Sequence, residues 1–281
     1  MPSKKHYPVQ RTLSVAQPSP TAANAVMDLS RLLSQVNHRL YRESRTYECS
    51  VQIDANVADA TTVDVYALAD TWYLKGALKL AKTAWDMSNA EEIAMNNGKV
   101  AGWNDFRIDD GLIGYGTLQV NQFLKGNVAA APFAAGQFDL SNVVDQAGTT
   151  RTFSVGGGGS GAFYDIFDEY DAQSGTSSDP EYPSTSPYTG LLPNLEADAA
   201  QAISDHGSEP PYNPQGYGDA VWVKVGTLHL ASGRQRLSTG NFIAPLGKIA
   251  LTGIGFLSAP DIQVTVKGGD YKGVMSHSML E

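Results

Sequence analysis

Residues 61–107 read TTVDVYALADTWYLKGALKLAKTAWDMSNAEEIAMNNGKVAGWNDFR, and this stretch decides how the rest of the chain is interpreted. From Thr61 to Leu68 the residues divide between two faces with a period of two, which predicts a half-buried strand. Asp70 then offers an N-cap carboxylate to a helix that falls within residues 71–96. Leu68 and Trp72 are close enough in sequence to pack together across the helix start. The stretch therefore predicts a strand that leads directly into a helix.

The predicted helix has one apolar face and one polar face. Its apolar positions recur at spacings of four, three and four residues: Leu74, Leu78, Ala81 and Trp85. Ser88 and Glu91 have the spacing of a capping box, which predicts a second short helix over residues 89–95. Tryptophan at helical spacing most often fills core volume, so we interpret Trp85 as a packing residue.

The rest of the chain is rich in strand patterns. The alternation is cleanest in residues 45–55, where Cys49, the only cysteine, is expected to be a small buried hydrophobe. Shorter β-rich runs cover residues 115–124, 137–144, 149–155, 220–231, 240–246, 247–256 and 261–268. This pattern predicts a mainly β fold, an antiparallel β-sandwich of jelly-roll type with inserted helices. Two small stacked jelly rolls would also fit the chain length.

The domain organisation follows from local composition. Residues 1–20 contain several prolines and predict a flexible basic arm, and residues 21–44 predict an amphipathic helix. The apolar stripe of that helix consists of Val26, Leu29, Leu33, Val36 and Leu40. Residues 45–281 then form the jelly-roll domain, which carries the helical insertion 71–96 and acidic loops over 156–218.

Charge is distributed unevenly along the chain. The protein has a net charge of −9, yet its first 45 residues are basic. Their basic residues are Lys4, Lys5, Arg11, Arg31, Arg39, Arg42 and Arg45. Residues 152–223 contain acids but neither lysine nor arginine. We therefore expect the seven basic residues to be the nucleic-acid-binding set, through contacts to phosphates without base reading.

No cofactor is predicted. The glycine-rich run 156–161 lacks the Gly-Lys-Ser or Gly-Lys-Thr ending of a phosphate-binding loop, so a turn is the better interpretation. Asp165, Asp168 and Asp171 are calcium candidates, although their spacing does not match a calcium-binding loop. The N-terminus has no apolar run after its basic residues, which argues against a secretory signal, and we expect synthesis inside a cell. No apolar stretch is long enough to predict a membrane span.

Two other classes of function compete. An enzyme is not predicted, because the histidines are scattered and neither HExxH nor GxSxG occurs, although acidic loops leave glycoside hydrolysis open. The histidines are His6, His38, His206, His229 and His277. A carbohydrate-binding or adhesive β-sandwich would use exposed tyrosine rings. Its candidates are Tyr182, Tyr188, Tyr212 and Tyr217.

The words YALADTWYLKGALKLAKTAW and WNDFR, with the basic arm and the β-rich end, carry a resemblance to known proteins. The chain resembles coat proteins of small icosahedral viruses, particularly those of environmental circular single-stranded DNA genomes. The resemblance covers mainly residues 40–110 and 220–256, and this arm lacks the dense arginine run of many such coats. It implies a capsid protein located in the virion, a homo-oligomeric shell of many copies, and a nucleic-acid partner.

Overall fold

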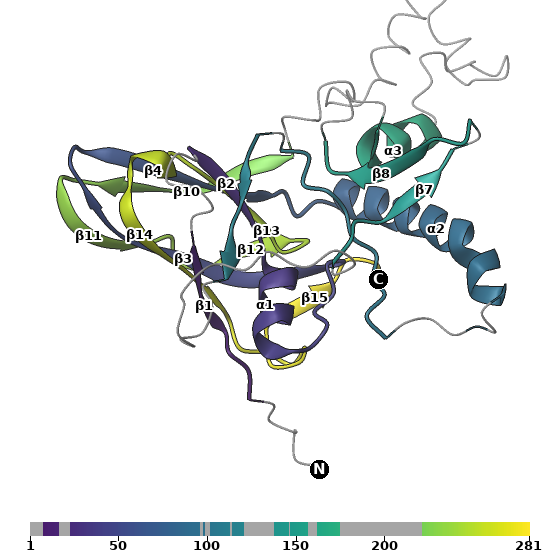
Figure 1. The fold of residues 1–281 in the computed structure, drawn as a ribbon, viewed down its shortest axis with the longest axis horizontal. Coiled ribbons are helices and arrows are strands. Elements are labelled where there is room, and N and C mark those ends of the chain that lie inside the picture. The colour runs from purple at the N-terminus through teal and green to yellow at the C-terminus, as the bar shows by residue number, and fades with distance from the viewer. Residues whose placement is uncertain are drawn as a thin grey trace, which may run out of the picture.

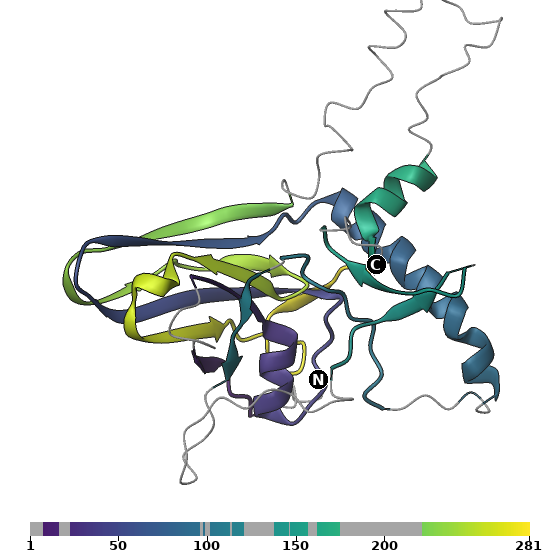
Figure 2. The same ribbon diagram turned by 45° about the horizontal axis from the view of Figure 1, so that its top comes forward.

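The structure is a computed structural model that describes residues 8–16, 23–95, 98, 102–112, 114–120, 138–145, 147–156, 162–174 and 221–281. Two β-sheets lie face to face as the layers of a sandwich (Figures 1 and 2). The first contains β1 (Thr12–Ala16), β3 (Arg45–Val57), β11 (Gly233–Ser238), β12 (Phe242–Pro245) and β14 (Ser258–Val266). The second contains β2 (Asn24–Asp28), β4 (Thr61–Leu68), β10 (Trp222–Leu230) and β13 (Lys248–Thr252). Short strands extend them: β5 (Gly116–Thr117), β6 (Gln119–Val120) and β15 (Ser276–Ser278).

The strand pairing defines a jelly roll. β11 and β12 pair with consecutive parts of β3, so together they form one interrupted strand. We number the main strands in chain order and count β11 and β12 as one. The first (β1) then pairs with the last (β14), and the second (β2) pairs with the seventh (β13). β3 pairs with β11 and β12, and β4 pairs with β10. In this nested antiparallel pairing, each main strand of the first half of the chain pairs with a main strand of the second half. Such pairing defines a single jelly roll. It confirms the predicted fold class and leaves no room for two stacked rolls within the described strands.

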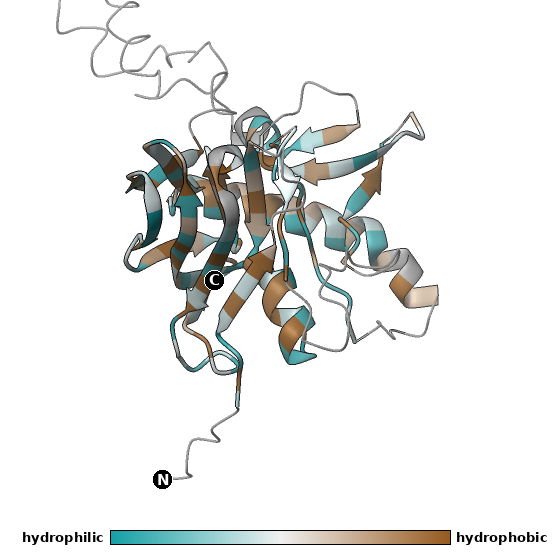
Figure 3. Cartoon of the chain, turned by 60° about the vertical axis from the view of Figure 1, so that its left-hand side comes forward, coloured by the Kyte–Doolittle hydropathy of each residue, from teal (hydrophilic) through white to brown (hydrophobic). Residues whose placement is uncertain are grey.

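The main hydrophobic core fills the space between the two sheets. Tyr47, Cys49, Val51 and Ile53 of β3 point into it and are fully buried, and Val65 of β4 joins them from the opposite sheet. Apolar and polar bands alternate along the strands (Figure 3). The period-two pattern of residues 45–55 therefore predicted the buried face correctly, including the buried thiol of Cys49.

The connection between β4 and β10 is a large insertion beside one end of the sandwich (Figure 1). It contains α2 (Trp72–Met95), a small sheet of β7 (Asn142–Val144), β8 (Thr150–Ser154) and β9 (Phe163–Asp165), and α3 (Ile166–Ser174). A second hydrophobic cluster joins these elements, with Leu74 and Leu78 of α2 packed near Phe153 and Phe167. Leu246, which precedes β13, belongs to the same cluster, so the insertion packs onto the jelly roll.

The start and length of α2 differ in detail from prediction. The helix is capped by Thr71, whose Oγ1 accepts a hydrogen bond from the Leu74 N–H at 3.2 Å, and not by Asp70, which pairs with Lys75. Trp72 is 65% exposed and does not join Leu68 in the core. The predicted second helix is wrong, because the Ser88 hydroxyl donates to the Trp85 carbonyl and the helix continues to Met95. A serine whose hydroxyl bonds to a backbone carbonyl of the preceding turn can lie inside a helix, so the capping-box spacing did not mark a helix start here.

The N-terminal prediction was also wrong in part. Residues 12–16 form β1 within the first sheet, where Leu13 and Val15 are buried, so they are not a flexible arm. The predicted helix over 21–44 is shorter. Residues 24–28 form β2, and α1 (Leu29–Asn37) begins only after Asp28. Asp28 is its N-cap, because its Oδ1 accepts from the Ser30 and Arg31 N–H groups.

Further differences concern short elements. β11 and β15 were not predicted, because GRQRLS and SHS have few apolar residues. The run 115–124 contains only the two short strands β5 and β6 among its described residues. Part of the predicted acidic loop is ordered as β9 and α3, and residues 175–218 lie outside the described residues. None of the helices in the described part of the chain is long and apolar enough to cross a bilayer.

The position of β1 in the sandwich predicts that substitutions of two neighbouring residues change the free energy of unfolding by very different amounts. Leu13→Ala should lower the free energy of unfolding by about 2–5 kcal/mol, because it leaves a cavity between the sheets. Thr12→Ala, on the exposed face of the same strand, should cost less than about 1 kcal/mol. Urea unfolding followed by tryptophan fluorescence measures both. Equal, small effects would mean that residues 12–16 behave as an arm.

Candidate nucleic-acid interface

The structure brings part of the predicted basic set together at the lower end of the molecule in Figure 1, around the C-terminal end of α1. Arg39 and Arg42 lie between α1 and β3, and Arg45 is the first residue of β3. Arg11 precedes β1, and its guanidinium lies directly against Gly268. Arg31 is not part of this group, because its Nε pairs with Asp28 at 3.3 Å. Lys4 and Lys5 lie outside the described residues.

A tight turn near the C-terminus completes the group. Tyr271 and Val274 exchange both backbone hydrogen bonds, at 3.1 and 2.9 Å, and so close a two-residue hairpin. The two central residues, Lys272 and Gly273, have positive φ angles of 49° and 92°, as a type I′ turn requires. The Tyr41 hydroxyl donates to the Lys272 carbonyl at 3.1 Å, and the Lys272 ammonium donates to the Leu40 carbonyl. The turn therefore holds a lysine against the segment that follows α1.

Tyr271 organises the cations of this group. The Arg45 guanidinium carbon lies 3.8 Å from the centroid of its ring, and the Lys272 nitrogen lies 5.3 Å from it. The Tyr271 hydroxyl accepts a hydrogen bond from the Arg42 N–H at 3.2 Å. Arg45 is held further by Ser276, to whose hydroxyl and carbonyl it donates at 2.9 and 3.0 Å. Such cation–π and hydrogen-bond contacts fix the direction of both charges without neutralising them.

Arg42 connects the surface group to buried acids. Its Nη1 pairs with Asp105 Oδ1 at 2.8 Å, and the Asp105 side chain is almost fully buried. The other oxygen of Asp105 accepts from the Glu43 N–H at 3.1 Å. Glu43 Oε1 in turn accepts from the Ile108 N–H at 3.1 Å. The segment that carries the basic group is thereby attached to residues 105–108 of the insertion.

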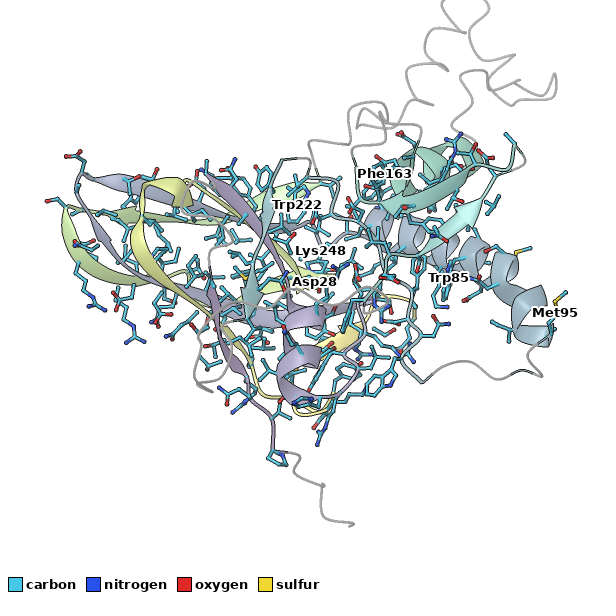
Figure 4. The ribbon with its side chains drawn as sticks, in the orientation of Figure 1. Asp28, Trp85, Met95, Phe163, Trp222 and Lys248 are labelled. Carbon is cyan, nitrogen blue, oxygen red and sulfur yellow. The ribbon has the colours of Figure 1, made fainter. Side chains whose placement is uncertain are left out.

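A buried lysine lies beneath this attachment. Lys248, the first residue of β13, is 3% exposed and pairs with Glu43 at 2.8 Å and with Asp28 at 3.6 Å. Lys248 and Asp28 face each other at the centre of the molecule (Figure 4). Asp110 is also partly buried near Lys248, and Arg31 pairs with Asp28. Three carboxylates thus face two cations in a site of low dielectric constant, so one carboxylate is in excess.

The pKa shifts locate the excess proton at Glu43. Burial raises the pKa of Glu43 to about 7, although Lys248 opposes the shift. Burial acts in the same direction on Asp28, but Lys248, Arg31 and hydrogen bonds outweigh it and lower the pKa of Asp28. For Lys248 burial acts to lower the pKa, and the surrounding carboxylates outweigh it and raise the pKa. Burial also raises the pKa of Asp110, but Glu43 has the larger shift and is therefore the group of this site that takes up a proton first as the pH falls.

Of the three calcium candidates, the structure describes the side chains of Asp165 and Asp168. Asp165 caps α3 through a 2.9 Å hydrogen bond from the Phe167 N–H, and burial raises its pKa. Asp168 is exposed on α3, and the side chain of Asp171 lies outside the description. No group of three histidine, cysteine, aspartate or glutamate side chains that could hold a metal occurs in the described ranges. Asp165 is explained as a helix cap.

The described histidines, which were considered for an enzyme, lie on separate elements of the fold. His38, His229 and His277 are exposed on a helix end, on β10 and on β15. His6, His206 and the four candidate tyrosines fall outside the described ranges. A cavity of about 270 Å³ opens between α2 and the small sheet, and Leu80, Ala84, Val143 and Phe153 are among its lining residues. Its lining is mainly apolar, with Glu169 as the charged member.

Lys272, Tyr271 and Lys248 were missed by sequence reasoning. Glycines at 268, 269 and 273 signal turns, but nothing local indicates that Lys272 would meet Arg45, which is far away in sequence. Lys248 lies in a run of apolar residues, and a lysine at the end of a predicted strand is normally expected to be exposed to solvent. Comparison with known proteins adds no relative, since no family model, curated protein or solved structure matches the chain significantly.

Glu43 predicts a specific pH dependence of stability. Its pKa is about 7 when folded and near the ordinary 4.5 when unfolded, so the folded chain holds an extra proton between these values. The free energy of unfolding should then fall as the pH rises from about 4.5 to 7, with a slope of at most about 1.4 kcal/mol per unit. Glu43→Gln should flatten this slope in thermal unfolding measured from about pH 5 to pH 8.

The matched control is Glu48→Gln. Glu48 lies on β3 and forms a partly exposed pair with Lys267 at 2.7 Å. This variant should retain the wild-type slope, because surface ion pairs contribute little to stability. An unchanged slope in Glu43→Gln would show that the proton resides elsewhere in the buried site.

Proposed function

We propose that this chain is a viral capsid protein, many copies of which assemble into an icosahedral shell around a nucleic-acid genome. The observation that carries the proposal is a jelly roll with a basic group on one side. A jelly roll is used by capsid proteins and also by lectins and small-molecule-binding proteins, so the fold alone does not decide. The arrangement of charge supplies the further argument.

The charge distribution suits a shell subunit. A shell turns one surface toward its polyanionic genome and another toward solvent, and these surfaces have different electrostatic requirements. Arg39, Arg42 and Arg45 come after α1 in the chain, and Lys272 lies close enough to all three for their charges to lower its pKa. α3, whose first turn carries Asp168 and Glu169, lies on the other side of the molecule from α1 (Figure 1). The α1 end is therefore the proposed inner surface of the shell.

Exposed apolar side chains also favour assembly. Met87 and Met95 of α2 are 72% and 84% exposed, and Trp103 and Val144 are exposed on the same insertion. Met95 lies at the end of α2 that projects furthest from the jelly roll (Figure 4). Large apolar groups that gather on one part of a surface are typical of protein contacts. In a shell they would be covered by neighbouring copies, which are the proposed partners.

Particle formation tests the proposed function. Purified full-length protein should form closed particles of uniform size in negative-stain electron microscopy, and light scattering should report a mass far above the 30.0 kDa of one chain. Uniform diameter is the control against amorphous aggregation, because only a closed point-group assembly has a fixed number of subunits. Monomers or dimers alone, across salt concentration and across about pH 5 to 8, would contradict the proposal. Binding of that monomer to a glycan array would then favour the carbohydrate-binding alternative.

A further inference from the structure

Two cations of the basic group lack an acidic partner. Arg45 and Lys272 form no ion pair within the described part of the chain, and their polar contacts are to the neutral atoms of Ser276 and Leu40. Both nevertheless lie beside the ring of Tyr271. Two like charges beside one ring repel each other, and the protein must offset that repulsion by other contacts. An anion bound between them would remove the repulsion.

The neighbouring charges strengthen this argument. Burial and the charges of Arg42, Arg45 and Arg39 lower the pKa of Lys272, and Asp105 only partly compensates. Asp105 is buried and already bonded to Arg42. Asp270 is the exposed acid of the same loop. The positive charge thus exceeds the negative charge on this surface.

The backbone adds a second, independent observation. Lys272 occupies a left-handed position of a type I′ turn, where asparagine or glycine is the usual residue and a lysine is strained. A fold that needed only the turn would be better served by Asn-Gly. A lysine at this position is understandable if its charge is needed where the turn places it.

We propose that Arg42, Arg45 and Lys272 form a built binding site for the phosphodiester backbone of single-stranded nucleic acid. The site deepens the proposed function and rests on it for the identity of its ligand. Arginine forks and a lysine ammonium match phosphate oxygens, and the three side chains are already held in place by the contacts to Asp105, Ser276 and Leu40. Little side-chain entropy is lost on binding, which favours affinity.

The site should bind the backbone without reading bases. Base recognition in single strands depends on an open aromatic face or on polar groups aimed at base edges. Arg45 lies over the Tyr271 ring, and Tyr41 meets that ring edge to face with centroids 6.1 Å apart. Arg45 thus covers one face of the Tyr271 ring, and the cations are the groups that we expect a ligand to contact. Oligonucleotides of different sequence should bind with similar affinity.

The test uses Lys272→Asn in the full-length chain, with unassembled subunits. Asparagine suits the left-handed turn position, so the melting temperature should stay unchanged or rise. Removing one phosphate contact should weaken binding of a labelled oligothymidine about fivefold at about 0.1 M salt and lower the salt slope by about 0.7. Fluorescence anisotropy measures both. The control is Lys79→Gln, which removes an exposed positive charge on α2 and should leave binding unchanged.

The outcomes separate the site from the shell. Unchanged binding and salt slope in Lys272→Asn would overturn the site, even if wild-type protein forms shells. Weaker binding in Lys272→Asn would support the site, even if wild-type protein never forms shells and the proposed function fails. Displacement of the oligonucleotide by low millimolar inorganic phosphate at constant ionic strength would identify free phosphate as the ligand and overturn the proposal. A strong preference for one base sequence over others would also overturn the proposal.

Discussion

The buried contact of Lys248 with the carboxyl groups of Glu43 and Asp28 is the interaction on which the arrangement of the molecule depends. Burying one lysine is unfavourable unless carboxylates surround it, and removing one partner of such a pair typically costs several kcal/mol. Here the partners come from β13, from the end of β2 and from the segment after α1. Because the Glu43 carboxyl also accepts a hydrogen bond from the Ile108 N–H, the same side chain holds the insertion against the jelly roll.

This buried site determines the surface above it. Glu43 is held from below by Lys248, and its own N–H is bonded to Asp105, which binds Arg42. The direction of Arg42 is therefore set by buried contacts and not by the arginine itself. A change in the protonation of Glu43 acts next to the residues that carry the basic group.

The jelly roll tolerates its long insertion for a topological reason. β4 and β10 are consecutive main strands that pair with each other, so the chain between them leaves and returns at the same end of one sheet. An excursion there does not separate any other strand pair, and loop closure costs rise only slowly with length. The insertion then forms a second core of its own, which contacts the first through Leu246 and its neighbours.

The sequence alone determined the strands with strict alternation and the apolar face of α2. Residues 45–55 and 61–68 were predicted correctly because a period of two is a local property of the chain. It also showed that Arg39, Arg42 and Arg45 are close together along the chain, although it placed the first two inside a helix that in fact ends at Asn37. It failed at β1, where five residues between proline-rich segments are strand only because β14 offers a paired edge.

Tertiary structure decided the rest. The pairing of first and last strands, the burial of Lys248 and the meeting of Lys272 with Arg45 all join residues that are far apart in the sequence. No periodicity records such contacts, because each depends on how the two sheets close on each other. The C-terminal turn shows this difference. Its Gly273 can be recognised as a turn residue from the sequence, but Lys272 meets the residues after α1 only when the chain has folded.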